Sequence, residues 1–102
     1  MTLKHRKFVA SLGCTICAMP AQCAHVRYSD AAAGKVNPGT SRRPDDVWTV
    51  PLCQAHHIEQ HAGGERAFWE KYRIDPVPLA RAIFRVSGNR NAAMLEIAKA
   101  RS

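Results

Sequence analysis

The chain contains 102 residues, a length that predicts a single small domain spanning 1–102, and its formal net charge of +7 favours a polyanionic partner. Charge alone is equally consistent with a ribosomal protein or a protein of membrane surfaces. No apolar stretch reaches the roughly 18 residues that a membrane-spanning helix needs, and the apolar run after the basic start is too short for a signal peptide, so we expect a cytoplasmic protein.

The first half of the chain predicts a helix, two strands and a long loop. Apolar residues recur at helical spacing within residues 4–12, and Gly13 ends this N-terminal helix. β-branched and aromatic residues predict a short strand over 23–28 and a second strand over 46–52. Residues 29–45 are rich in Gly, Pro, Ser, Asn and Arg and lack apolar periodicity, so we expect a long loop between the strands.

Four further helices are predicted in the second half of the chain. Trp48, Phe68 and Trp69 fall in patterned elements, so we expect them to pack in the core rather than to stack on bases. Met94 and Leu95 are expected to pack the last helix against that core. The four helices are predicted at 54–62, 65–72, 75–86 and 92–100.

Two pairs of residues have the spacing of a structural zinc site. Two residues separate Cys14 from Cys17, and two residues separate Cys53 from His56. Zinc in structural sites takes four thiolate or imidazole ligands, commonly supplied as two such pairs. Cys23 is an alternative to His56 as the fourth ligand, and otherwise a small buried apolar residue. A disulfide is a further alternative, although the accompanying histidines favour thiolates kept reduced in a cytosol.

Two histidines of the stretch 53–61 remain after the zinc ligands are assigned. His57 and His61 are four residues apart, which places both imidazoles on one face of the predicted helix. Consecutive helical residues project about 100° apart, so His57 does not share the face of His56. We therefore expect the two histidines to serve a second site; the alternatives are a surface pair or the donation of one of them to the zinc.

The order of several short motifs resembles the HNH endonucleases, and within them the small phage and prophage group of recombination-enhancement-function-like nucleases. The resemblance covers about residues 5–85 and rests on the motifs together, since each motif alone is weak. The motifs are Cys14-x-x-Cys17, Ala24-His25-Val26-Arg27, Arg43-Pro44-Asp45-Asp46, Val50-Pro51-Leu52-Cys53-x-x-His56-His57 and Gln60-His61-x-Gly63-x-Glu65-x-x-Phe68-Trp69. The resemblance implies an α+β fold with a ββα-metal core at about 14–62, a structural zinc knuckle and helices at both ends, including a helical extension at about 64–102.

The resemblance also implies roles for individual residues. His25 would be the general base, and Asp46 would orient it or support the catalytic ion. His57 and His61 would hold that ion. Ala24 stands where many relatives have a metal ligand, and no Asn corresponds to the residue that names the family. Four basic residues on or beside the predicted loop would contact phosphates and help the transition state: Arg27, Lys35, Arg42 and Arg43.

Together these expectations describe a metal-dependent DNA endonuclease of low sequence specificity that acts in phage or prophage DNA processing or recombination. Its cofactors would be a structural zinc and a catalytic Mg²⁺, Mn²⁺ or other divalent cation, and a phage-encoded chain would work in the cytoplasm of the bacterial host. A recombination or replication protein could recruit it. The alternatives are a zinc-stabilised nucleic-acid-binding module without catalysis, for which Ala24 is the suspect change, and a module that binds another protein through its helical tail.

Overall fold

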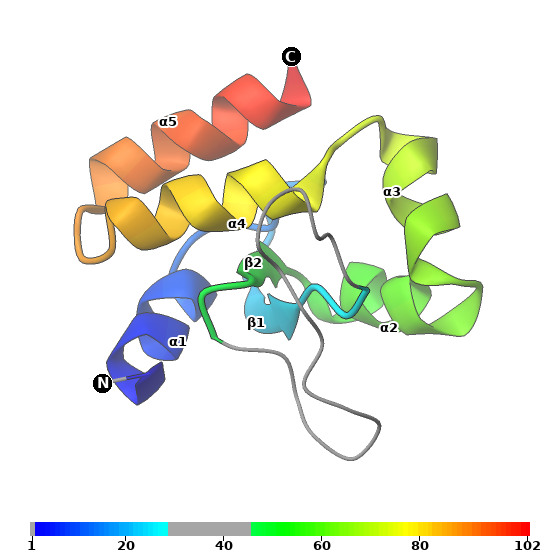
Figure 1. The fold of residues 1–102 in the computed structure, drawn as a ribbon, viewed down its shortest axis with the longest axis horizontal. Coiled ribbons are helices and arrows are strands. Elements are labelled where there is room, and N and C mark those ends of the chain that lie inside the picture. The colour runs from blue at the N-terminus through cyan, green and yellow to red at the C-terminus, as the bar shows by residue number, and fades with distance from the viewer. Residues whose placement is uncertain (1, 29–45) are drawn as a thin grey trace.

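Two short strands and five helices make up the described part of the chain. The structure is a computed structural model that describes residues 2–28 and 46–102, so the predicted loop at 29–45 lies outside the described residues. The α+β class is confirmed, and all the predicted helices are present. The elements, shown in Figure 1, are α1 (Thr2–Ala10), β1 (Gln22–His25), β2 (Thr49–Leu52), α2 (Gln54–Ala62), α3 (Glu65–Tyr72), α4 (Pro76–Arg85) and α5 (Arg90–Arg101).

The strands pair in antiparallel fashion, with His25 of β1 opposite Thr49 of β2. Both are shorter than the predicted 23–28 and 46–52. The three residues before Thr49 form a turn, because the Thr49 hydroxyl donates a hydrogen bond to the carbonyl of Asp46 at 2.9 Å. This local side-chain bond competes with the strand ladder and places Asp46 at the rim of the sheet.

The sheet lies at the centre of the hydrophobic core. α1 and α2 each contact both strands, α4 packs on β2, and α5 lies along α4 (Figure 1). All four residues of β2 are buried, as expected for a strand covered by helices. Trp48, Phe68 and Trp69 are buried, which confirms their assignment to the core. No helix in the described ranges is long and apolar enough to cross a membrane.

The prediction of which residues pack α5 against the core is wrong. Met94 and Leu95 are 42% and 58% exposed, whereas Ala93 and Ile97 are buried. Ala93 and Ile97 are four residues apart and therefore share one helix face, the face that meets α4. Large apolar residues also occur singly on protein surfaces, so their size did not identify the packed face of this short helix.

His5 is a buried histidine that joins α1 to the segment after α4. Its Nδ1 lies 2.8 Å from the hydroxyl of Ser87, and its ring meets that of Phe84 with 4.9 Å between centroids. Its Nε2 is buried without a hydrogen-bond partner among the described residues. Burial lowers the pKa of His5 below its ordinary value, although the charge of Asp46 acts in the opposite direction. The fold therefore favours the neutral imidazole.

We expect His5 to make the protein less stable in mild acid. A histidine whose pKa is lowered by folding contributes stability that is complete above the unfolded value of about 6.5 and declines as the pH falls below it. For one proton the decline is at most about 1.4 kcal/mol per pH unit. The free energy of unfolding, measured with urea at about pH 7.5 and about pH 5.5, should differ less between the two conditions in His5→Asn than in the wild type. An equal pH difference in both proteins would exclude His5 as the responsible group.

Candidate metal centre and histidine pocket

Cys14 and Cys17 lie in a tight turn between α1 and β1. The Ala18 N–H donates to the Cys14 carbonyl at 2.9 Å, and the Cys14 N–H donates to the Met19 carbonyl at 2.8 Å. Gly13 permits this closure, because a Cβ at its position would lie 3.0 Å from the carbonyl oxygen of Ala18. The backbone that carries the first ligand pair is therefore fixed by its own hydrogen bonds.

Thr15 and Arg101 fasten this turn to the rest of the fold. The buried Thr15 donates from both its N–H and its hydroxyl to the Pro51 carbonyl of β2, at 2.8 and 2.7 Å. Arg101 of α5 donates from Nε to the Thr15 carbonyl at 2.8 Å, and from Nη2 to the Cys14 carbonyl at 3.2 Å. The first ligand pair is thereby held against the strand whose end carries the second pair.

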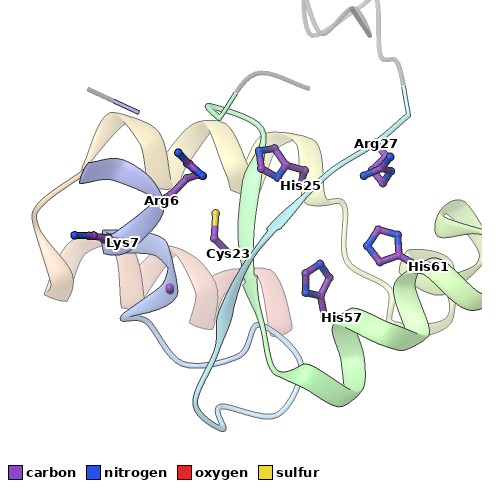
Figure 2. Close-up of a pocket in the computed structure, with 8 residues that line it drawn as sticks. Arg6, Lys7, Cys23, His25, Arg27, His57 and His61 are labelled. Carbon is purple, nitrogen blue, oxygen red and sulfur yellow. The ribbon is translucent and has the colours of Figure 1, made fainter. Parts of the chain in front are cut away.

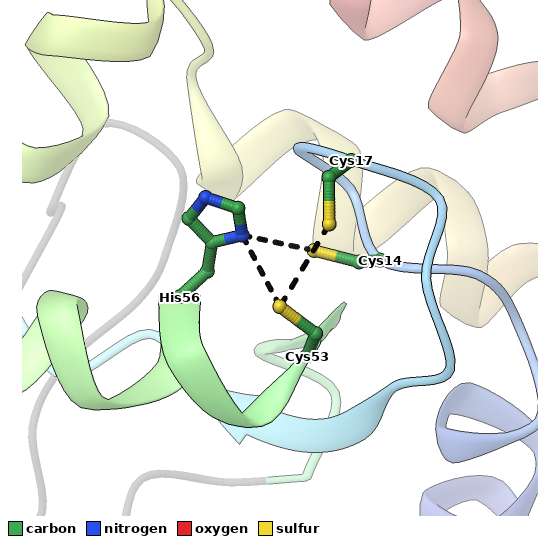
Figure 3. Close-up of side chains that lie close together, drawn as sticks. All are labelled: Cys14, Cys17, Cys53 and His56. Atoms are coloured by element: carbon green, nitrogen blue, oxygen red, sulfur yellow. Dashed lines mark hydrogen bonds between the residues drawn. The ribbon is translucent and has the colours of Figure 1, made fainter.

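The second ligand pair begins where β2 ends. Cys53 is the N-cap residue of α2, and His56 follows in the first turn of that helix. His56 Nδ1 lies 3.2 Å from Cys53 Sγ and 3.6 Å from Cys14 Sγ, while Cys17 Sγ lies 3.8 Å from Cys53 Sγ (Figure 3). The four candidate ligand atoms all lie within 4.8 Å of one another.

These separations resemble the edges of a zinc tetrahedron. Bonds of about 2.3 Å to sulfur and about 2.0 Å to nitrogen give edges of about 3.8 Å between two sulfurs and about 3.5 Å between sulfur and nitrogen. None of the four cysteines, all of which lie in the described ranges, forms a disulfide in place of a metal site. Cys23 lies outside the cluster, and His56 occupies the fourth position. The cluster is therefore compatible with a structural zinc site.

Electrostatics in the cluster also favour a bound cation. Burial opposes the ionisation of Cys14, but three backbone N–H groups and the His56 ring outweigh it and lower the pKa of this thiol to about 7. The Met19 N–H acts to lower the pKa of Cys17, yet burial and the two neighbouring sulfurs together raise it. One thiolate thus forms readily and repels the next, a repulsion that a divalent cation removes.

A pocket of about 370 Å³ lies between α1 and α2, with β1 running between the two helices (Figure 2). Its described lining contains basic and imidazole side chains and no carboxylate. Such a lining can bind an anion directly, or it can bind a metal ion together with an anion. The lining residues are Arg6, Lys7, Ala10, Cys23, His25, Arg27, His57 and His61.

His57 and His61 enter the pocket from α2, with 5.1 Å between their ring centroids (Figure 2). His57 Nδ1 lies 2.8 Å from the side-chain oxygen of Gln22 on β1. An amide oxygen can only accept, so Nδ1 carries the hydrogen and Nε2 keeps its lone pair. Burial and then the positive charges of His61, His25 and Arg27 lower the pKa of His57. Both effects favour the neutral ring that ligates a cation.

His25 is joined to a buried carboxylate. Its Nε2 lies 2.6 Å from Oδ1 of Asp46, and Arg6 of α1 forms an ion pair with Oδ2 of the same carboxylate at 3.1 Å. Because an ionised carboxylate only accepts hydrogen bonds, Nε2 carries the hydrogen and Nδ1 retains the basic lone pair. This is the arrangement in which a carboxylate holds one tautomer of a catalytic histidine.

The other residues assigned from the sequence have different outcomes. Arg27 lines the pocket, and Ala24 is fully buried and has only a methyl side chain, which cannot bind a metal. Lys35, Arg42 and Arg43 lie outside the described residues, and their phosphate contacts stay predictions.

Sequence reasoning did not identify four polar or basic residues that adjoin the predicted site. Arg6 contacts Asp46 and Gln22 contacts His57, each from an element distant in sequence, and Lys7 and Cys23 line the pocket. The alternation of strand residues could have placed Cys23 beside His25 on one face, because residues two apart in a strand share a face. No local signal marked Arg6 or Gln22, because their partners are set by the tertiary fold.

Comparison with known proteins gives a match to a protein family. The family of proteins of unknown function called DUF968 matches residues 1–86, a range that includes both the cysteine–histidine cluster and the pocket. No curated protein and no solved structure matches the chain. Since the match covers most of its length, the chain belongs to the DUF968 family.

Proposed function

We propose that this protein is a metal-dependent endonuclease that hydrolyses phosphodiester bonds in DNA. The observation that carries the proposal is the pocket that His25, held by Asp46, lines together with His57 and His61. A histidine with one fixed tautomer can act as a general base, and two further imidazoles with a cationic lining can supply the positive charge that phosphodiester hydrolysis needs.

The proposal identifies β1, β2 and α2 as the ββα-metal unit of an HNH endonuclease. The antiparallel strands and the helix that follows them support this identification, because His25 is on the first strand and both remaining histidines are on the helix. Zinc in the cysteine–histidine cluster would have a structural role, since that cluster uses four protein ligands and leaves no position for a substrate.

The proposed chemistry follows from the side chains of the pocket. His25 accepts a proton from the water that attacks the phosphorus, and the negative charge of Asp46 stabilises the imidazolium that forms. The bond from phosphorus to the leaving deoxyribose oxygen breaks, and that oxygen takes up a proton from solvent. His57 and His61 would hold a divalent ion such as Mg²⁺ or Mn²⁺, which would supply positive charge to the phosphate oxygens.

Basic residues in the pocket support a nucleic-acid substrate bound mainly through phosphate. Arg27 and Lys7 lie on opposite sides of the pocket, and the chain has a net charge of +7. Contacts to phosphate carry no sequence information, so we propose a DNA nuclease of low sequence specificity in phage or prophage DNA processing. Lys35, Arg42 and Arg43 would add contacts of the same kind, and a recombination or replication protein would be a suitable recruiting partner.

A second candidate function is a zinc-stabilised nucleic-acid-binding module without catalysis. Ala24 favours it, because this residue occupies the place of a metal ligand in the resemblance and is fully buried. In this alternative the cationic pocket binds phosphate, and His57 and His61 hold no catalytic ion.

Incubation of the purified protein with plasmid DNA and Mg²⁺ or Mn²⁺ tests the proposed function. We expect nicking or linearisation by the wild type, and a loss of about 100-fold or more in His25→Ala, because the general base is removed. His25→Ala purified by the same protocol also controls for contaminating nucleases. DNA binding measured by fluorescence anisotropy should persist in this variant. Binding without cleavage under every divalent ion would favour the second candidate instead.

A further inference from the structure

The outer edge of β1 is held by side chains instead of a third strand. In the described part of the chain β1 pairs only with β2, so the backbone groups on its other edge require different partners. Gln60 of α2 donates from Nε2 to the carbonyl of His25 at 3.1 Å. The N–H of Arg27 donates to Oε1 of Glu65, at the start of α3, at 2.9 Å. The carbonyl of His25 and the N–H of Arg27, at the end of the strand, are therefore both hydrogen-bonded to side chains.

These two side chains form a connected unit, which we call the Gln60–Glu65 clamp. Gln60 Nε2 also donates to Oε2 of Glu65 at 2.8 Å, and the indole N–H of Trp69 donates to the same oxygen at 3.1 Å. Glu65 therefore accepts hydrogen bonds from β1's continuation, from α2 and from α3. Gln60 is 1% exposed and Trp69 is 2% exposed, so water does not readily replace the bonds that these two side chains donate, whereas the bond from the Arg27 N–H is exposed.

The clamp connects the strand that carries the proposed base to the helix that carries the proposed ion ligands. Gln60 lies between His57 and His61 on α2, yet it points into the core instead of the pocket. Its bond to the His25 carbonyl sets the position of β1 along α2. Neither Gln60 nor Glu65 belongs to the described lining of the pocket, so the clamp acts on the reaction through other residues.

We propose that Gln60 and Glu65 are positioning residues that fix His25 and Arg27 relative to His57 and His61. The proposal rests on the proposed nuclease function of the pocket. Displacement of a reacting group by about 1 Å costs on the order of 100-fold in rate, so a small relaxation of β1 against α2 reduces cleavage.

Glu65→Gln is the sharpest test of the clamp. The substitution keeps the size of the side chain but replaces one accepting oxygen with an NH₂ group, which faces N–H donors and cannot accept from them. Glu59→Gln is the matched control. Glu59 also links α2 to α3, through bonds of 2.8 Å from Lys71 and from the hydroxyl of Tyr72, but these bonds do not reach β1.

Two measurements test the hydrogen bonds of the clamp without depending on nuclease activity. We expect Glu65→Gln to accelerate hydrogen exchange of the Arg27 amide by about 10-fold or more, since that N–H loses its acceptor. We also expect it to shift the NMR signals of the His25 ring, because the strand that carries His25 relaxes. Glu59→Gln should leave both observables at their wild-type values. Gln60→Met removes the hydrogen bonds of Gln60 at nearly constant size, so it should shift the NMR signals of the His25 ring in the same way. It replaces Glu65→Gln as the test variant if Glu65→Gln does not fold.

Cleavage kinetics then test the positioning role. We expect Glu65→Gln to lower kcat by about 10- to 100-fold with little change in KM, and to cause no further loss when His25 is already alanine. Unchanged His25 ring signals in both clamp variants would overturn the proposal, and so would shifted signals with a wild-type kcat. A wild-type protein that cleaves no DNA would instead overturn the nuclease function, and the His25 ring signals would still decide whether the clamp positions this residue.

Discussion

Replacement of Cys14 with serine should abolish the folded state of this protein. Cys14 is fully buried, and its sulfur is one of the four clustered ligand atoms. Binding of a structural zinc contributes about 10–16 kcal/mol in small zinc-binding peptides, whereas a domain of ordinary stability unfolds at a cost of about 5–15 kcal/mol. We therefore expect loss of zinc, loss of cooperative unfolding in urea and poor solubility. Metal analysis of the wild type should find about one tightly held zinc per chain.

Cys23→Ser is the matched control for this experiment. Cys23 lies outside the cluster and lines the histidine pocket, so its replacement should leave zinc content and cooperative unfolding close to those of the wild type. Removal of the metal by a strong chelator should reproduce the Cys14→Ser result in the wild-type chain. A Cys14→Ser protein that is folded and free of zinc would contradict the assignment of a structural site.

Local patterns in the sequence predicted the order of the elements, and the family resemblance implied the class of the fold. The stop signal of α2 was accurate, because Gly63 follows its last residue as the sequence indicated. The predicted end of the first helix at Gly13 was wrong, because α1 ends at Ala10, before that glycine. Strand boundaries were also inaccurate, because the turn ahead of Thr49 depends on a side-chain hydrogen bond to Asp46 that composition does not reveal. The packed face of α5 depended on the position of α4, a partner that periodicity in so short a helix did not specify.

Some contacts of the candidate site could be predicted from local sequence, whereas others join residues that are far apart in the chain. The spacing of Cys53 and His56 is a property of one helical turn, so the sequence alone could pair them. Arg6 and Asp46 meet only because α1 packs on the sheet, and Gln22 reaches His57 across 35 residues. Such contacts orient the groups that the motifs name, and a single sequence contains no periodic signal for them.

The helix α2 belongs to both candidate sites. His56, on its first turn, contacts the sulfurs of the cluster, while His57 and His61 line the pocket. Cys53 caps the same helix, so closure of the cluster around a metal fixes where α2 begins. Loss of the cluster should therefore also disturb the pocket, whereas changes confined to the pocket face should leave the cluster intact.

The three neighbouring histidines should consequently fall into two classes when each is replaced by alanine. His56→Ala should lose zinc and, as in Cys14→Ser, cooperative unfolding in urea, because the fourth ligand of the cluster is removed. His57→Ala and His61→Ala should remain folded with zinc bound but lose about 100-fold or more of the cleavage rate, because the proposed ion loses its ligands. Zinc content, urea melts and plasmid cleavage on the three variants make the comparison.

Helix geometry explains why His56 should behave differently from His57 and His61. His56 and His57 project about 100° apart, so one ion cannot readily use both rings, whereas His61 is one turn beyond His57 and shares its face. The opposite pattern of zinc loss among the three histidines would contradict the two-site assignment. Loss of tightly bound zinc in His57→Ala or His61→Ala, or unchanged stability and zinc content in His56→Ala, would show that one shared site replaces the two separate sites proposed for α2.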